Sequence, residues 1–359
     1  MEQPVEKEKR VRIGITHGDV NGISYEIIIK TLQDQRLIEQ YTTLVYGSSK
    51  VASYHRKAMN INDFNFNLVK KSDQAHPRRA NIINIHDEEI KLDLGKSTTI
   101  AGELALLSLE AACDDLQKNN IDAVVTAPIN KKNIQSPEFT FPGHTEYFAR
   151  KFGVENFLML MVTHSVRIGV VTGHIPLIKV KEAISEDLIV KKIEVLNHSL
   201  KRDFGVLKPR IAVLALNPHA GDDGLLGDEE QNIILPAIQK AYNNDILAFG
   251  PYPADGFFGS SNFRHFDGIL AMYHDQGMIP FKLMSFEEGV NFTAGLPIIR
   301  TSPAHGTAYD LAGKNEASPE AFRSALFLAA DIYQNRVQYD ELRANPLKTS
   351  AIQPENPRS

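Results

Sequence analysis

The alternation of short apolar, β-branched runs with longer segments of 3.6-residue periodicity constrains the fold of this chain more than any other feature. Eight runs are typical of buried strands, namely residues 11–16, 43–46, 80–85, 123–126, 158–162, 167–172, 211–215 and 268–272. Five segments between them have helical periodicity, namely residues 22–32, 102–116, 186–200, 229–242 and 319–333. This alternation predicts an α/β fold in which helices cover a parallel sheet. Because 359 residues exceed the size of most single cores, we expect two domains.

Charge and cysteine content exclude several classes of protein. The formal net charge of −5 gives no long-range attraction for nucleic acid or for an anionic membrane surface. The single cysteine, Cys113, has no partner for an intramolecular disulfide and lies in an apolar stretch, so we expect a buried, inert thiol. The charged first ten residues lack the apolar core of a secretory signal, and no apolar run is long enough to span a bilayer. These features predict a soluble, cytoplasmic enzyme without nucleic-acid or membrane partners.

Five of the twelve histidines follow a predicted strand or lie in a glycine-rich turn: His144, His174, His219, His274 and His305. Residues at strand ends form the sites of α/β enzymes. Three imidazoles from separate loops, with one open coordination position, are typical of a catalytic zinc site, and our candidates are His174, His219 and His274. The alternative for each histidine alone is a hydrogen bond to a carbonyl in its own turn. Ligands spread over about a hundred residues form no short local pattern that decides between the two.

Two cations stand at the ends of apolar runs. Lys282 follows residues 276–281, and Arg300 follows residues 295–299. Burying a cation without a partner is unfavourable, which argues against a role in the core. Guanidinium and ammonium groups suit a carboxylate and a phosphate, so the two residues could bind an anionic ligand. Solvent exposure is the alternative.

Two widespread enzyme signatures are missing from the sequence. Residues 14–22, after the first predicted strand, do not match the Gly-x-Gly-x-x-Gly fingerprint, and there is no Walker lysine loop. A standard Rossmann domain is therefore disfavoured. The Gly-x-Ser-x-Gly nucleophile elbow is also missing, which argues against a serine hydrolase of the α/β type.

Eight short motifs occur together along the chain. They are Gly18-Asp19, Thr126-Ala127-Pro128-Ile129-Asn130-Lys131, Gly143-His144-Thr145-Glu146, Gly173-His174-Ile175-Pro176-Leu177, Asn217-Pro218-His219-Ala220-Gly221, Pro253-Ala254-Asp255, Met272-Tyr273-His274-Asp275-Gln276-Gly277 and His305-Gly306-Thr307-Ala308. In this order the series resembles the 4-hydroxythreonine-4-phosphate dehydrogenase family of pyridoxal phosphate biosynthesis, over residues 11–335. Each motif alone is weak, and the ordered combination is highly specific.

The resemblance implies a fold similar to isocitrate and isopropylmalate dehydrogenases, with two α/β domains flanking a cleft and an NAD site that lacks the Rossmann fingerprint. It implies a cofactor-side domain of residues 11–140 plus 296–340, and a metal-binding and dimerisation domain of residues 141–295. Residues 1–10 and 345–359 are expected to be flexible tails.

The resemblance also implies site residues and a homodimer with its active site at the interface. The family's divalent metal (Zn, Mg, Co or Mn) is held by histidines from both chains, which correspond here to His174, His219 and His274. Family substrate contacts fall on His144, Thr145, Lys282, Asn291 and Arg300.

The activity implied is the NAD-dependent oxidation of a small phosphorylated hydroxy acid, 4-phosphohydroxy-L-threonine. The resulting 3-oxo acid decarboxylates to 3-amino-2-oxopropyl phosphate. A divalent metal would lower the pKa of the substrate hydroxyl and polarise the new carbonyl. By analogy with related decarboxylating dehydrogenases, Lys282 is our first candidate for the base that removes the hydroxyl proton, and Asp255 is the second.

One stretch departs from the family pattern and bears on the alternatives. Where the family has Gly-Asp-Pro-Ala-Gly-Ile-Gly-Pro-Glu, residues 18–26 read Gly-Asp-Val-Asn-Gly-Ile-Ser-Tyr-Glu. We expect this loop to shape the cleft and so to affect substrate preference more than reaction type. The nearest alternative is a dehydrogenase of erythronate or threonate 4-phosphate. A zinc hydrolase and a non-catalytic metabolite-binding protein are further alternatives.

Overall fold

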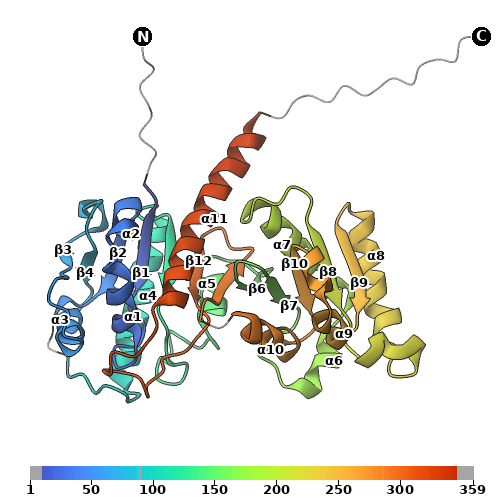
Figure 1. Ribbon diagram of the computed structural model, residues 1–359, viewed down its shortest axis with the longest axis horizontal. Coiled ribbons are helices and arrows are strands. Elements are labelled where there is room, and N and C mark those ends of the chain that lie inside the picture. Colours follow the sequence, from blue (N-terminus) through green and yellow to red (C-terminus); the bar gives the residue numbers. More distant parts are fainter. Residues whose placement is uncertain (1–9, 87, 89, 286, 346–359) are drawn as a thin grey trace, which may run out of the picture.

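A computed structural model describes residues 10–86, 88, 90–285 and 287–345 (Figure 1). Its strands are β1 (Arg12–Thr16), β2 (Thr42–Gly47), β3 (Asn67–Val69), β4 (Asn81–Asn84), β5 (Ala123–Thr126), β6 (Leu158–Val162), β7 (Arg167–Val170), β8 (Arg210–Leu214), β9 (Leu247–Tyr252), β10 (Gly268–Ala271), β11 (Val290–Ala294) and β12 (Arg300–Pro303). Its α-helices are α1 (Ser24–Leu32), α2 (Gln35–Gln40), α3 (Ser49–Ala58), α4 (Thr99–Gln117), α5 (His144–Lys151), α6 (Val180–Ala183), α7 (Glu186–Arg202), α8 (Leu235–Asn243), α9 (Ala254–Gly259), α10 (His274–Ser285) and α11 (Glu320–Ala344). Shorter helical turns are η1 (Ser72–Gln74), η2 (Leu177–Lys179), η3 (Pro218–Gly224), η4 (Glu230–Ile234, a π-helix) and η5 (Ser261–His265).

Each of the eight predicted strand segments contains a strand, and each of the five predicted helical segments contains a helix. The α/β fold class is therefore confirmed. The boundaries differ most at the carboxyl end, where α11 continues to Ala344 rather than ending near residue 333. Cys113 is fully buried in α4, as predicted, and burial raises the pKa of its thiol to about 12.

The strands of the described residues form one twelve-stranded sheet in the order β3-β4-β2-β1-β5-β12-β11-β6-β7-β10-β8-β9. The sheet is parallel on both sides of its centre, but β11 runs antiparallel to β12 and β6, and β6 runs antiparallel to β7. The prediction of a wholly parallel sheet is wrong at this place. The connection between β6 and β7 is a four-residue turn, in which the hydroxyl of Thr163 accepts bonds from the backbone of Ser165 and Val166. A connection this short can only join antiparallel strands.

The order of the strands in the sheet separates two parts of the chain. Strands β1 to β5 and β12 lie on one side of the β11–β12 contact, and β6 to β11 lie on the other. Helix α11 packs against β12 and β5 and also touches α7, so it lies across the middle of the molecule (Figure 1). The predicted division into residues 11–140 plus 296–340 and residues 141–295 remains a prediction. The predicted tails lie outside the described residues except for residues 10 and 345.

Buried aliphatic side chains cover the sheet on both faces. The largest apolar cluster runs from β1 and α1 through β6 and α7 to α11, while separate clusters lie beneath α4 and α5 and beneath α9 and α10. Among the described residues, no helix is both long and apolar enough to cross a membrane. The parallel arrangement brings the carboxyl ends of β7, β10, β8 and β9 to one edge, where the predicted metal-binding turns begin.

Candidate active site

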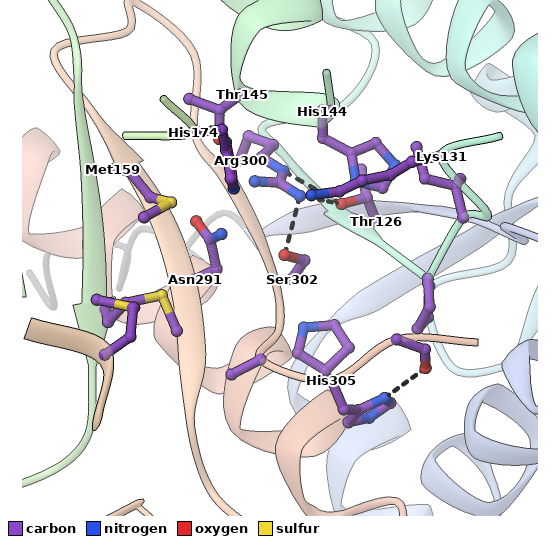
Figure 2. A pocket seen from close by; sticks show the side chains of 18 of the residues that line it. Thr126, Lys131, His144, Thr145, Met159, His174, Asn291, Arg300, Ser302 and His305 are labelled. Atoms are coloured by element: carbon purple, nitrogen blue, oxygen red, sulfur yellow. Dashed lines mark hydrogen bonds between the residues drawn. The ribbon is translucent and has the colours of Figure 1, made fainter. Parts of the chain in front are cut away.

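A cavity of about 280 Å³ opens in the middle of the molecule (Figure 2). Its walls come from the turn after β5, the start of α5, strands β6, β11 and β12, helix α10 and the turn after β12. Its polar lining residues include Thr126, Lys131, His144, Thr145, Glu146, His174, His274, Lys282, Asn291, Arg300, Ser302 and His305. Seven of the nine predicted site residues therefore line one cavity, although they are spread over more than a hundred positions of the chain.

Arg300 is the most deeply buried cation of this cavity, with 1% of its surface exposed. Its Nε and Nη2 donate to the hydroxyl of Thr126 at 3.1 and 2.8 Å, and Nη2 also donates to the hydroxyl of Ser302 at 2.9 Å. The described residues place no carboxylate within hydrogen-bond distance of this guanidinium, and burial lowers the pKa of Arg300 to about 9. A buried charge that has only hydroxyl partners is unfavourable without an anion. The cavity therefore has the electrostatic character of an anion-binding site.

Two lysines add to this positive charge. Lys131, in the turn after β5, extends toward Arg300 in Figure 2, and Lys282 comes from α10. Neither lysine forms a salt bridge with any residue that the structure describes. Three cations on one cavity suit a ligand with more than one negative charge, because bonds between charged groups are the stronger ones.

His144 opens helix α5, after Gly143 as its N-cap residue. Burial, together with the charges of Arg300 and Lys131, lowers its pKa well below the usual range, so the imidazole is neutral at pH 7. Its Nε2 is buried and has no hydrogen-bond partner among the described residues. The same is true of Glu146 Oε2, Asn291 Oδ1 and His305 Nε2 in this cavity. Because buried polar atoms are nearly always paired, four unpaired ones indicate a place for a polar ligand.

His174 and His274 come together because their strands are neighbours. β7 and β10 are adjacent and parallel, and the backbone N–H and hydroxyl of Thr172 both donate to the carbonyl of Met272. The side chain of Gln276 fixes the turn that joins β10 to α10. Its Oε1 accepts from the backbone N–H of Met272 at 2.7 Å, and its Nε2 donates to the carbonyl of Ala215 at 2.6 Å. The two imidazole rings lie 5.5 Å apart, centroid to centroid.

A carboxylate lies beside the Nδ1 atom of each of these imidazoles. Asp275 Oδ1 is 2.7 Å from His274 Nδ1, and Glu146 Oε1 is 3.7 Å from His174 Nδ1. A carboxylate at one ring nitrogen leaves the other nitrogen as a ligand, which is the usual surrounding of metal-binding histidines. The chemistry of the pair therefore fits two ligands of a borderline divalent cation.

His219 follows β8, the next strand of the sheet, but it does not line the cavity. It is exposed on the turn η3, where six consecutive residues have positive φ: His219, Ala220, Gly221, Asp222, Asp223 and Gly224. Each non-glycine residue in this conformation costs roughly 1–2 kcal/mol. Within the described residues, no group of three or more His, Cys, Asp or Glu side chains is placed to hold a metal ion. The three-histidine ligand set stays a prediction that requires a second copy of the chain.

Asp255, the second candidate base, is also outside the cavity. It lies exposed in the first turn of α9, after β9. Within one chain it is therefore not placed beside Lys282, which does line the cavity.

The structure adds residues that the sequence analysis did not assign to the site. Lys131 and Glu146 line the cavity within two of the motifs that carried the resemblance, but neither was given a role. Thr126 and Ser302 hold Arg300, and His305 was noted only for its position in a turn. Lys131 could have been found from the sequence, because it is a cation that follows a predicted strand. Lys282 and Arg300 were selected for the similar reason that each follows an apolar run. No sequence signal marks Ser302, because the polar strand β12 was not predicted.

The divergent loop at residues 18–26 does not line the cavity. Tyr25 is fully buried and stacks between His17 and His55, with ring centroids 5.5 and 5.3 Å away. Asn21 donates to the hydroxyl of Thr98 and accepts from the backbone of Asp93, so it anchors the segment before α4. The residues of this chain that depart from the family pattern, Val20, Asn21, Ser24 and Tyr25, are thus buried and do not line this cavity.

Four known proteins or families are similar to this chain. The family model of the pyridoxal phosphate biosynthetic protein PdxA matches residues 39–329. A 4-hydroxythreonine-4-phosphate dehydrogenase of Bacteroides thetaiotaomicron is 50% identical over 95% of this chain and 94% of its own length. The crystal structure of 4-hydroxythreonine-4-phosphate dehydrogenase from Klebsiella pneumoniae is 34% identical, covers 91% of this chain and 100% of its own, and superposes with a TM-score of 0.79. A protein of Oceanobacillus iheyensis, named as a candidate D-threonate 4-phosphate dehydrogenase, is 37% identical over 90% of this chain and 98% of its own length.

Proposed function

This chain belongs to the PdxA family of pyridoxal phosphate biosynthetic proteins, and on that premise we propose that it is a 4-hydroxythreonine-4-phosphate dehydrogenase. It would oxidise 4-phosphohydroxy-L-threonine with NAD to a 3-oxo acid, which decarboxylates to 3-amino-2-oxopropyl phosphate. The observation that carries the proposal is the cavity that buried Arg300, whose hydrogen-bond partners are hydroxyl groups, lines together with Lys131 and Lys282. Such a site suits a substrate that carries both a phosphate and a carboxylate.

The anionic substrate would be held from several directions. Arg300 supplies a forked donor, Lys131 and Lys282 supply point charges, and Thr145 adds a hydroxyl that now lies 3.3 Å from the hydroxyl of Thr293. Neutral His144 can donate from one ring nitrogen without adding charge. The buried acceptor Asn291 Oδ1 would take a hydrogen bond from the substrate. These contacts fix the reacting carbon, which lowers the entropy cost of the chemical step.

His174 and His274 would hold the divalent metal (Zn, Mg, Co or Mn) together with His219 of a second copy. When bound, the metal acts as a Lewis acid on the substrate hydroxyl and the new carbonyl. The chain's own part is to keep Asp275 and Glu146 beside the two imidazoles, so that the outward nitrogens remain free to bind. Lys282, on the cavity wall, is our first candidate for the group that takes the hydroxyl proton, and Asp255 remains the second.

NAD would approach from the wall formed by the turn after β12. A methyl group added at Gly306 would meet no atom within 4 Å, so this wall leaves open space beside the cavity. A flat ring can approach a backbone that carries no side chain. NAD supplies the hydride acceptor, and the protein orients the substrate carbon toward it.

A homodimer is supported by exposed apolar side chains on the two segments that follow His174 and His274 in the sequence. We call this surface the α10 patch and define it by Ile175, Leu177, Ile178, Ile279 and Leu283, which are 39%, 72%, 86%, 60% and 71% exposed. A second cavity of about 410 Å³ lies next to it and shares His174 and His274. Contiguous exposed aliphatic side chains mark interaction surfaces. A second copy seated here would bring its own residues to the metal-binding imidazoles, and we place the dimer in the cytoplasm.

The resemblance to the Oceanobacillus iheyensis protein supports one alternative, a dehydrogenase of threonate 4-phosphate. The two substrates differ by an amino group or a hydroxyl group next to the carboxylate. Glu146 Oε2 is buried, unpaired and on the cavity wall, and a carboxylate binds an ammonium group better than a hydroxyl group. A hydrogen bond from the substrate ammonium group to Glu146 would therefore favour 4-phosphohydroxy-L-threonine over threonate 4-phosphate.

The test is to incubate the purified dimer with NAD, a divalent metal and each phosphorylated acid in turn, and to follow NADH absorbance. We expect rapid NADH formation with 4-phosphohydroxy-L-threonine and slow or no formation with threonate and erythronate 4-phosphate. Preferential turnover of a sugar acid phosphate would establish the alternative. Release of phosphate without NADH would indicate a hydrolase and overturn the proposal.

A further inference from the structure

The turn that carries His219 is held in an unusual conformation. All five residues from His219 to Asp223 have φ between 45° and 81°, and four of them are not glycine. A left-handed run of this length does not persist by its own preference, because the side chains crowd the following carbonyls. Other parts of the molecule must therefore hold it.

Two buried glutamates, Glu229 and Glu230, contact the residues that lead into this turn. Glu230 Oε1 accepts from the backbone of Leu216 at 2.8 Å and of Asn217 at 2.7 Å. The Asn217 side chain donates to Glu230 Oε2 at 2.9 Å and to Glu229 Oε2 at 2.7 Å. Glu229 is also paired with Lys181 of α6, at 2.5 Å. The glutamates thus tie the start of the turn to the start of the following helix.

Two glycines leave room for this arrangement. A Cβ at Gly221 would lie 2.7 Å from Glu230 Oε2, and a Cβ at Gly227 would lie 2.5 Å from Asn217 Nδ2. Both glycines also have positive φ. Glu230 begins the π-helical turn η4, which places the two adjacent glutamates against the same asparagine. The backbone, the glycines and the two carboxylates therefore form one interlocked unit.

The result of this arrangement is an exposed His219. Its neighbours Leu225 and Leu226 are exposed as well, and the turn lies outside the cavity of its own chain. We propose that Glu229 and Glu230 are positioning residues, which hold the left-handed turn so that His219 is presented to the metal site of a second copy. This inference rests on the proposed function, because it takes His219 to be the third metal ligand.

The experiment measures Co²⁺ affinity and inorganic phosphate affinity on the full-length protein. Co²⁺ is titrated and followed by its visible absorption, and phosphate is titrated by calorimetry. The variants are Glu230→Gln and Glu229→Gln, which remove charge and keep size. Asp228→Asn is the matched control, because Asp228 is adjacent but exposed, and among the described residues its side chain accepts a hydrogen bond from Asn232 and none from Leu216 or Asn217. His219→Ala measures the contribution of the ligand itself.

We expect Glu230→Gln to weaken Co²⁺ binding by roughly 10- to 100-fold, as is usual for groups that support metal ligands. Phosphate affinity should stay at the wild-type value, and Asp228→Asn should change neither. A general loss of structure would reduce both affinities, so the split between them separates positioning from folding. If Glu230→Gln yields no folded protein, the two affinities are compared in Glu229→Gln instead. This variant keeps the three hydrogen bonds that Glu230 accepts from Leu216 and Asn217.

The failures of the two proposals are distinguishable. If His219→Ala weakens Co²⁺ binding and neither glutamate variant does, the positioning role is wrong while the metal site stands. If both affinities fall together in the glutamate variants, the role is structural only and the inference is overturned. If His219→Ala binds Co²⁺ as tightly as the wild type, the three-histidine site is wrong and the inference is overturned with it.

Discussion

The guanidinium of Arg300 donates two hydrogen bonds to the hydroxyl of Thr126, at 3.1 and 2.8 Å, across the contact between β12 and β5. Thr126 is the last residue of β5, so the strand end itself orients the buried cation. Hydroxyl groups fix the direction of the guanidinium without pairing its charge, and the carboxylate of Glu146 acts on that charge without a hydrogen bond. This relationship explains how the fold can keep a cation buried and available to an anion.

We expect Arg300→Met to separate binding from stability. The variant keeps much of the side-chain volume and removes the buried charge, so the melting temperature should be unchanged or higher. Substrate KM should rise by roughly 10- to 100-fold, because a charge-assisted hydrogen bond to the substrate is lost. Steady-state kinetics and calorimetric melting check both points. An unchanged KM in a folded variant would remove Arg300 from the substrate site.

The imidazoles of His17 and His55, which stack on the two faces of Tyr25, should make the free energy of unfolding depend on pH. Burial lowers the pKa of each to about 4, against 6.5 in the unfolded chain. Between pH 6.5 and pH 4 the imidazoles are protonated in the unfolded state and neutral in the folded state. The free energy of unfolding is therefore highest above pH 6.5 and falls as the pH is lowered toward 4. The loss should reach about 3 kcal/mol per imidazole. Urea unfolding between pH 7 and pH 4 measures it, and His55→Gln should give a shallower curve than the wild type.

Tyr25 should matter for stability and not for substrate preference. Tyr25→Ala removes a fully buried ring between two imidazoles and should cost about 3–5 kcal/mol. Tyr25→Phe removes the hydroxyl that accepts from the backbone N–H of Ser48 at 2.8 Å and donates to the Ser48 carbonyl at 3.5 Å, and should cost about 1–3 kcal/mol. Urea unfolding gives the free energies. A shift in the KM ratio of the aminated and hydroxylated substrates in Tyr25→Phe would show that the divergent loop acts on specificity.

Charges placed in the α10 patch should dissociate the dimer. Ile178→Asp and Leu283→Asp put carboxylates into a surface that two copies would bury, so sedimentation should show monomers at concentrations where the wild type is dimeric. Activity should fall with the dimer. Leu207→Asp is the matched control, because Leu207 is 87% exposed and lies outside the patch. Active, dimeric Ile178→Asp protein would place the interface elsewhere.

The strand and helix pattern could be predicted to a large extent, because buried strands and amphipathic helices have distinct periods. Strand β12 escaped prediction because Arg300, Thr301, Ser302 and Pro303 are polar or break strands, although all four are buried. Its antiparallel neighbour β11 was missed as well. Strands β3 and β9, at the two edges of the sheet, were missed too, so the unpredicted strands lie both at its centre and at its edges.

The site was predictable only through the ordered motifs, since spacing alone gave no reason to group residues as distant as His144 and Arg300. Strand-end position selected His174 and His274, which the structure places after adjacent parallel strands and on the wall of one cavity. The same criterion selected His219, and the family analogy selected Asp255; the structure places both outside the cavity. A sequence does not tell whether a strand-end residue faces its own cleft or that of a second copy. Lys131 and Glu146 lay within recognised motifs, and their roles required the three-dimensional arrangement.

The central claim is that His174 and His274 of one chain share a metal with His219 of another, and mixing two inactive variants tests it directly. His219→Ala and His274→Ala should each be inactive and deficient in metal. Dissociated and reassociated together, they form hybrid dimers in which one of the two sites has all three histidines. The account predicts that activity and bound metal return to about a quarter of the wild-type level, since half of the dimers are hybrids with one intact site each. If the mixture reassociates and remains inactive, the three histidines do not form a shared site and the account is wrong.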